Sequence, residues 1–138
     1  MRIGYSTTVF RQHTLNDAIE AIGKAGFCAL DLMADKPHGY PQDLTAARLA
    51  ELQGELARRK LVVSSLNACT LRADPEARDP SWLDPDWRMR EQRISQTLAS
   101  LRLAAALGVR AVITPGGGPL PDGMNEGEAT RLFAAGLN

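Results

Sequence analysis

Residues 93–118 read RISQTLASLRLAAALGVRAVITPGGG, and this stretch decides the fold. Apolar side chains in its first half are spaced to share one face of a helix: Ile94, Leu98, Leu101 and Ala105. Gly108 is predicted to end this helix, because glycine enters the left-handed cap conformation without a steric penalty. Residues 111–114 (AVIT) then predict a strand buried on both faces. A helix, a buried strand and a glycine-rich loop at the strand's carboxyl end indicate half of a parallel α/β unit.

Length and composition place the chain in a broad class. Its 138 residues are enough for one domain with a hydrophobic core. Lys plus Arg and Asp plus Glu number 16 each, so no overall field favours nucleic acid or an anionic membrane as a partner. The uncharged apolar stretches are shorter than the roughly 20 residues of a membrane-spanning helix, and no secretory signal is recognised, which predicts a cytoplasmic protein. Cys28 and Cys69 are too few for a disulfide framework, and we expect both to be reduced.

The same strand-then-helix order recurs along the chain. Strands are predicted at residues 2–6, 27–33 and 61–66, besides 111–114, and polar loops at residues 7–13 and 67–86. N-caps are predicted for the first and second helices at Thr14 (with Asp17 completing a capping box) and Asp43, and the fourth helix is expected to begin near Asn125. Their predicted inner faces are, in order, Leu15, Ala18, Ile19 and Ile22; Ala46, Leu49, Leu52 and Leu56; and Ala129, Leu132 and Phe133.

Four strand-helix units imply a parallel sheet with right-handed crossovers. Either an open doubly wound sheet or part of a (β/α)8 barrel fits this order. The first strand is not followed by a G-x-G-x-x-G turn, which disfavours a dinucleotide-binding sheet. A whole barrel needs roughly 250 residues. We therefore expect residues 1–138 to form a single domain, a partial TIM barrel of about four βα units truncated in the fourth helix.

Three segments resemble the xylose isomerase-like TIM barrel superfamily: residues 15–32 (LNDAIEAIGKAGFCALDL), 61–68 (LVVSSLNA) and 101–118 (LRLAAALGVRAVITPGGG). The superfamily includes sugar-phosphate isomerases and epimerases, ketose 3-epimerases, inosose dehydratases and endonuclease IV. Asp31 stands where the family usually has Glu. The resemblance covers essentially the whole chain as the N-terminal half of the barrel, and it is more specific for the superfamily than for any substrate.

The resemblance implies a metal-dependent sugar or sugar-phosphate isomerase or epimerase that transfers a proton next to a carbonyl. In the family a divalent metal (Mn, Mg, Co or Zn) is held by Glu, Asp, His and Glu on strands five to eight. No residue of this chain matches those positions, so we assign no metal ligand and no catalytic residue, and we expect the chain alone to bind no metal and to be inactive. Endonuclease IV also uses histidines at the ends of strands three and four, where this chain has Asn67 and Thr114, which disfavours a DNA-repair activity.

In a parallel barrel the carboxyl ends of the strands line the active site. That rule selects Tyr5, Ser6, Asp31, Met33, Asn67, Cys69 and residues 114–117. From this set we predict five contacts to a sugar or sugar phosphate, namely Tyr5, Asn67, Cys69, Thr114 and Gly116.

Several of these residues also have a simpler interpretation. Residues 116–118 fit a phosphate cradle made of backbone N–H groups, or a flexible turn. Asn67 suits a sugar hydroxyl and local backbone capping equally well. For Asp31 we favour a structural hydrogen bond to a neighbouring strand, and for Cys69 an inert thiol.

Residues outside the strand ends carry weaker signals. His13 is predicted to be exposed. His38 fits a loop over the mouth of the barrel or a solvent-exposed loop, and the exposed loop is favoured. Trp82 and Trp87 are suited to closing over a sugar ring, although packing of the long loop against the third helix is favoured. The group Arg88, Arg90 and Arg93 fits a phosphate site or a solvated helix start.

Three hypotheses follow. The chain is the N-terminal half of a sugar isomerase or epimerase, a half-barrel that assembles as a homo-oligomer through its open edge strands, or a small α/β binding module that takes an anion at the Gly116 loop. The first is favoured because four family-like units follow one another.

Overall fold

The computed structural model describes residues 3–69, 80–117 and 119–138. The strands are β1 (Gly4–Ser6), β2 (Ala29–Met33), β3 (Val62–Asn67) and β4 (Val112–Ile113). The helices are η1 (Thr7–Phe10), α1 (Leu15–Lys24), η2 (Pro41–Asp43), α2 (Ala46–Arg58), α3 (Trp87–Leu107) and α4 (Glu126–Leu137). Residues 70–79, half of the predicted loop at 67–86, lie outside the described residues, as do Arg2 and Gly118. No helix in the described ranges is long and apolar enough to cross a membrane.

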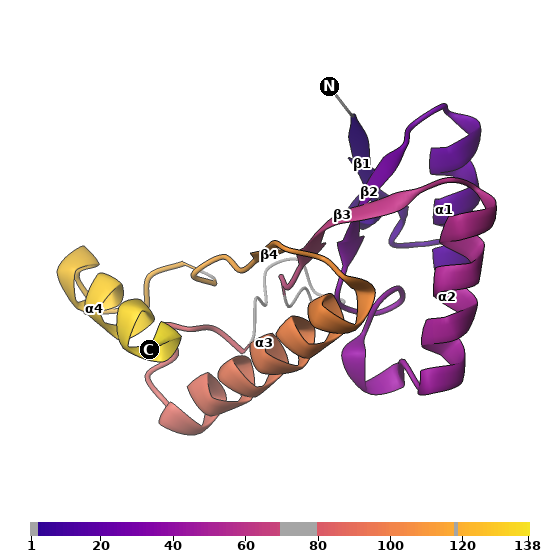
Figure 1. The fold of residues 1–138 in the computed structure, drawn as a ribbon. Coiled ribbons are helices and arrows are strands. Elements are labelled where there is room, and N and C mark those ends of the chain that lie inside the picture. The colour runs from indigo at the N-terminus through magenta and orange to yellow at the C-terminus, as the bar shows by residue number, and fades with distance from the viewer. Residues whose placement is uncertain (1–2, 70–79, 118) are drawn as a thin grey trace.

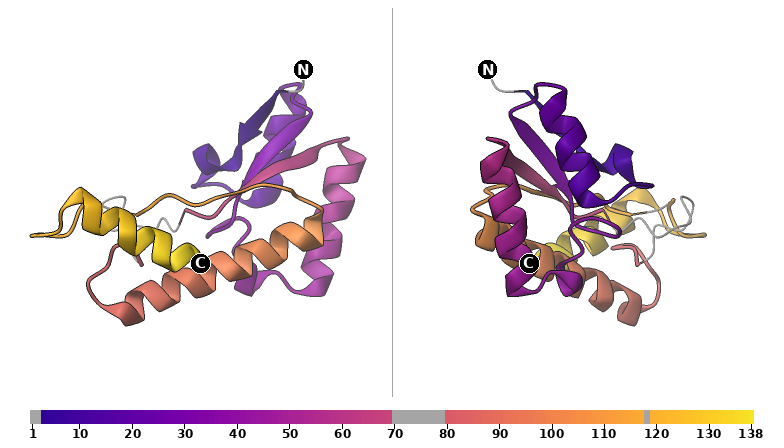
Figure 2. Two further views of the ribbon diagram at one scale, coloured as in Figure 1. Left: turned by 60° about the vertical axis from the view of Figure 1, so that its left-hand side comes forward. Right: turned by 90° about the vertical axis from the view of Figure 1, so that its right-hand side faces the viewer.

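The four strands form one sheet in the order β1-β2-β3-β4, and every neighbouring pair is parallel (Figure 1). Strand order follows chain order without a reversal, so the sheet is not doubly wound. Figure 2 shows α1 and α2 side by side against the sheet, with α3 next to them and α4 beyond α3. This arrangement is the curved succession of βα units that was predicted as part of a barrel.

The hydrophobic core lies between the sheet and the first three helices. Side chains alternate along a strand, so Leu30 and Leu32 of β2 share one face and point toward the helices. The helices fill this layer with five large apolar side chains: Ile19, Ile22, Leu52, Leu56 and Leu103. Within α2 the predicted inner face is wrong only at Ala46, which is exposed, since Leu52 and Leu56 are buried and the half-buried Leu49 packs against the core.

Helix boundaries mostly follow the predicted caps. Thr14 forms the predicted capping box with Asp17, and Gly108 ends α3 with a left-handed φ of 68°. The fourth helix begins next to Asn125 as expected, and Asn125 also forms a capping box, with Glu128. The predicted cap of α2 is wrong: Thr45, not Asp43, accepts from the backbone N–H of Arg48. Asp43 is instead the last residue of η2.

The predicted inner face of α3 is wrong. Leu98 and Leu101 are each 47% exposed and Ala105 is exposed, whereas the buried residues are Arg93, Thr97, Ser100, Leu103 and Ala104. Small and polar side chains occupy the sheet-facing side, where Thr97 donates to the carbonyl of Arg93 and Ser100 to that of Gln96. Hydroxyls bonded to their own helix bury without loss of hydrogen bonds, so this face can be buried although it is not apolar.

Two further predictions are corrected. The strand at 111–114 is not buried on both faces, because Ile113 is 50% exposed on the face away from α3 and β4 is an edge strand. The predicted loop at 7–13 contains η1, which Ser6 caps by accepting from the backbone N–H of Thr8.

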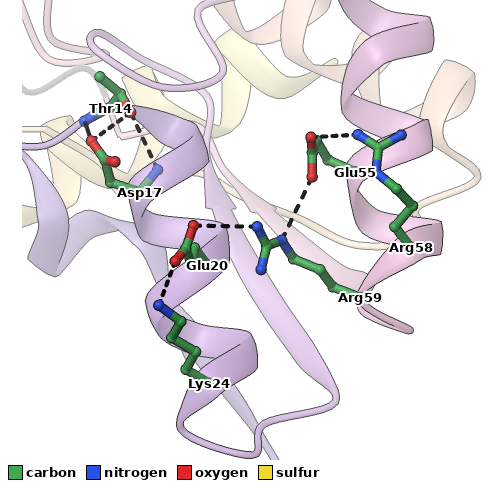
Figure 3. Close-up of polar contacts among 7 residues, drawn as sticks. All are labelled: Thr14, Asp17, Glu20, Lys24, Glu55, Arg58 and Arg59. Atoms are coloured by element: carbon green, nitrogen blue, oxygen red, sulfur yellow. Dashed lines mark hydrogen bonds and ion pairs between the residues drawn. The ribbon is translucent and has the colours of Figure 1, made fainter.

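Ion pairs connect α1 and α2 on the outer surface (Figure 3). Arg59, just after α2, reaches Glu20 of α1 at 3.3 Å and Glu55 of α2 at 3.6 Å. Glu20 also pairs with Lys24 one helical turn later. The hydrogen bond and charge of Lys24, followed by the charge of Arg59, lower the pKa of Glu20 below its ordinary value.

We expect Glu20→Gln to lower the free energy of unfolding at neutral pH. A carboxylate whose pKa is lowered by folding contributes stability above its unfolded pKa and loses it as the pH falls through the lowered folded value. The difference between the variant and the parent chain should therefore shrink toward about pH 3, as measured by urea unfolding across pH. Glu51→Gln, at an exposed position of α2, is the matched control, and an equal loss at both pH values would contradict the assignment.

Candidate functional site

A polar row crosses three strands on the face opposite the helices. The register pairs Ser6 of β1 with Asp31 of β2, and Asp31 with Ser65 of β3. Ser6 Oγ donates to Asp31 Oδ2 at 2.8 Å, and Ser65 Oγ donates to Asp31 Oδ1 at 2.7 Å. Both carboxylate oxygens thus accept from neighbouring strands, which confirms the structural role expected for Asp31.

A second row lies nearer the carboxyl ends of the strands. Met33, Asn67 and Ile113 are register partners across β2, β3 and β4. Asn67 Oδ1 accepts from the backbone N–H of Cys69 at 3.1 Å, so the amide caps the end of its strand. Its Nδ2 group donates to no other described residue. Asn67 thus performs the capping role and still has an N–H group for a ligand.

The loop after β4 is held by side chains from the segment before α3. Thr114 Oγ1 accepts from Trp82 Nε1 at 3.0 Å, and the carbonyl of Gly116 accepts from Ser81 Oγ at 3.4 Å. Gly117 has a φ of 95°, and a Cβ there would lie 2.5 Å from Ser81 Oγ. These contacts favour a tightly packed glycine turn over a free phosphate cradle.

Arg93 has a structural role that the sequence analysis did not predict, since a solvated helix start is wrong for this residue. Only 1% of it is exposed, and its Nη2 donates to the carbonyl of Ala68 at 3.0 Å, to Thr114 Oγ1 at 2.9 Å and to the carbonyl of Pro115 at 3.3 Å. The guanidinium therefore joins the ends of β3 and β4, and its burial lowers its pKa. Its neighbours behave differently, since Arg88 is exposed and Arg90 donates to loop carbonyls just before α3.

The two tryptophans have separate environments. Trp82 is buried, lies 5.7 Å from the guanidinium of Arg93 and meets Phe133 of α4 edge to face at 5.6 Å. This confirms that Trp82 packs against α3. Trp87 is 58% exposed at the first turn of α3, so the same prediction is wrong for it.

The structure brings together four of the five predicted sugar contacts. Asn67, Cys69, Thr114 and Gly116 lie around the ends of β3 and β4, which Arg93 links. Cys69 is half-buried beside Asn67. Tyr5 lies apart from them, on the helix-facing side of β1 opposite Leu30, where it stacks on Phe27 at 5.2 Å. The role of each in binding stays a prediction.

His38 is not the exposed loop histidine that was predicted. It is only 6% exposed, because the backbone N–H groups of His38 and Gly39 donate to the carbonyls of Asp35 and Met33 and fold the loop back onto β2. Its Nε2 lies 3.2 Å from the carbonyl of His13, which is itself exposed as predicted. Burial lowers the pKa of His38, and backbone hydrogen bonding only partly offsets this effect.

A groove of about 860 Å³ lies between the first two βα loops and α2. It is bordered by His13, His38, Arg48, Glu51 and Glu55. None of the five predicted sugar contacts borders it, and its rim carries both signs of charge. The groove is therefore a separate feature from the strand ends.

The donor set of the inner face does not fit a metal ion. Across the described ranges, no three His, Cys, Asp or Glu side chains come together in a way that could hold a metal. Asp31 provides a carboxylate there, but both its oxygens are engaged by serine hydroxyls. Hard divalent cations need several oxygen ligands, and catalytic zinc needs three protein ligands.

Parallel βα units in chain order, with polar side chains on the inner face, define a segment of a TIM barrel. A sequence model described as xylose isomerase-like TIM barrel matches residues 19–138. The chain belongs to this family. No curated protein matches it significantly.

Solved structures share the fold over nearly the whole chain. They include 3-keto-D-glucoside 4-epimerase from E. coli (TM-score 0.71, 14% identity), a D-tagatose 3-epimerase-like protein (0.75, 18%) and D-psicose 3-epimerase with D-tagatose from Clostridium cellulolyticum H10 (0.66, 13%). Each match covers 99% of this chain and 49%, 46% and 46% of the respective structure. The chain thus spans about half the length of these proteins.

We expect Arg93→Met to destabilise the fold by about 2–4 kcal/mol, because the carbonyls of Ala68 and Pro115 lose the guanidinium as donor and Thr114 keeps only Trp82. The stability of Arg93→Lys should lie between that of the parent chain and that of Arg93→Met, since an ammonium group keeps the charge but not the planar fork of donors. Urea unfolding measures both variants. Arg110→Met, at an exposed arginine, is the control, and its free energy of unfolding should stay within about 0.5 kcal/mol of the parent chain. An effect of Arg93→Met no larger than that of Arg110→Met would contradict the role given to the guanidinium.

His38 predicts a fall in stability on mild acidification. A histidine buried in its neutral form binds protons more readily in the unfolded chain, so stability decreases as the pH falls through the ordinary value of 6.5. We expect the urea midpoint to be lower at about pH 5 than at about pH 7, and His38→Gln to flatten this dependence. His13→Gln should leave the slope unchanged. A slope that persists in His38→Gln would contradict the prediction.

Proposed function

We propose that this chain supplies the first four βα units of a cytoplasmic, metal-dependent sugar or sugar-phosphate isomerase or epimerase. The reaction class is proton transfer at a carbon next to a carbonyl. The observation that carries the proposal is the match of the whole chain to about half of two epimerases and an epimerase-like protein, together with family membership. These relatives act on sugars by their printed names, and the same substrate class is proposed for this chain.

In this proposal the chain contributes binding rather than proton transfer. A sugar needs donors and acceptors for its hydroxyls and an apolar surface for its ring carbons. Asn67 offers its Nδ2 group and Ile113, its register partner, offers an exposed apolar side chain at the same strand ends. Asp31 lies two residues deeper along β2 than Met33, with both oxygens occupied, so it is poorly suited to act as the base.

The metal of the proposed enzyme is assigned to residues other than those described here. When bound, such a metal polarises the carbonyl and the neighbouring hydroxyl of the substrate. The described side chains do not fit a divalent ion. The contribution of this half is the shape and polarity of one side of the binding site.

A second candidate is a binding module without catalysis. It is favoured by the engagement of Asp31 and by the lack, in the residues the structure covers, of any metal-holding group. In that case the ligand is an anion at the backbone of residues 114–117. The two candidates differ in which probe binds and where.

We expect D-tagatose to bind weakly, with a dissociation constant on the order of millimolar, and to shift the amide NMR signals of Asn67 and Gly116. Removing one hydrogen bond to a sugar hydroxyl costs about 1 kcal/mol, so Asn67→Ala should weaken binding about fivefold. Asn16→Ala, at an exposed asparagine of α1, is the matched control and should bind as the parent chain does.

Inorganic phosphate is the second probe in the same titration. Shifts at Gly116 and Gly117 with phosphate, and none with D-tagatose, would favour the binding module. Shifts confined to His13 and Glu51 would move the site to the groove beside α2. Either outcome, or no shift with either probe, would overturn the assignment of the strand ends to a sugar.

A further inference from the structure

One flank of α3 carries an apolar stripe that the fold leaves uncovered. Its members follow heptad-like intervals of seven, four, three and four residues: Trp87, Ile94, Leu98, Leu101 and Ala105. Ile94 is half-buried and the other four are exposed, three of them as large apolar side chains. At 1.5 Å per residue the stripe is about 27 Å long. Apolar patches of this extent on a soluble domain mark interaction sites.

The rest of the described chain does not use this stripe. The side of α3 that faces the sheet is the other one, which contains Arg93, Thr97, Ser100 and Ala104. The neighbouring helix α4 contacts α3, but its Phe133 packs against Trp82. Figure 1 shows α3 as a long helix along the border of the molecule. The stripe therefore has no partner within the described ranges.

The stripe is complementary to itself when two copies run antiparallel. We place the two-fold axis near residue 96. The numbers of two residues that face each other across the contact then add up to about 192. Ile94 then meets Leu98 of the second copy, and the large Trp87 meets the small Ala105. In an isologous contact each pairing occurs twice. One patch whose large and small side chains match in this way can therefore form the whole dimer contact.

Charges on the flank of the stripe obey the same symmetry. Glu91 and Arg102 are exposed, lie on the same side of the stripe by helical periodicity, and have no ion pair within the described part of the chain. In the antiparallel arrangement Glu91 of one copy lies beside Arg102 of the other, twice over. Matched sizes and opposite charges at one register favour a second copy over an unrelated apolar partner.

We infer that the α3 stripe is a homodimer interface in which two copies pack their α3 helices antiparallel. The contact uses the outer flank of the helix, so the strand ends that carry Asn67 and Thr114 stay open in both copies. This interface differs from pairing through the open edges of β1 and β4. It is independent of the proposed function, because it involves no residue of the sugar site.

Sedimentation and light scattering on the full 138-residue chain test the dimer. We expect twice the 14.9 kDa chain mass at high concentration, with dissociation on dilution. Leu98→Glu puts a charge at the centre of the stripe and should raise the dissociation constant at least about tenfold. Leu120→Glu changes an exposed leucine outside the stripe and is the matched control, expected to leave it unchanged.

Charge reversal tests the antiparallel register itself. Glu91→Arg and Arg102→Glu each place like charges opposite each other and should weaken the dimer several-fold, about three to ten times. The double reversal should restore it, and mixing the two single variants should give a heterodimer tighter than either homodimer. A chain that is monomeric at millimolar concentration, or an assembly insensitive to both Leu98→Glu and the reversals, would overturn the inference.

Discussion

The alternation of side chains along β2 is the constraint on which the rest of the structure depends. Leu30 and Leu32 point toward the helices, whereas Asp31 points to the opposite face. A shift of one residue in pairing would exchange these faces and bury a carboxylate among leucines. The two serines that bond Asp31 from β1 and β3 hold this register from both sides. One strand therefore separates a hydrophobic layer from a polar inner surface.

Much of this fold could be predicted from the sequence because its signals are local. Capping boxes at Thr14 and Asn125 act over three residues, and the left-handed residue at Gly108 needs only its own lack of a side chain. The order of strands then follows from short right-handed crossovers. What the sequence could not predict was which side of α3 faces the sheet. The most apolar side was the natural prediction, but small residues such as Ser100 and Ala104 are buried on the sheet-facing side.

The candidate site could also be predicted in part from the sequence. Parallel strands bring their carboxyl ends to one edge, which placed Asn67, Thr114 and Gly116 together without any coordinates. Arg93 was named only as part of an arginine group, and its structural role was not predicted, because the burial of a guanidinium depends on three acceptors in two distant segments of the chain. Tyr5 was placed at the strand ends by position alone, and the alternation along β1 turned it toward the helices.

Arg93 and the apolar stripe are two consequences of the same choice of face on α3. With its polar side against the sheet, the helix can insert a guanidinium under the ends of β3 and β4 and tie them to Trp82. A leucine in that position would fill the space but leave the carbonyls of Ala68 and Pro115 without a donor. The apolar residues are then displaced to the flank, where most of them are exposed in the described fold. Organising the strand ends by a buried charge thus creates an exposed hydrophobic surface elsewhere on the same helix, and a neighbouring helix is the simplest way to cover it.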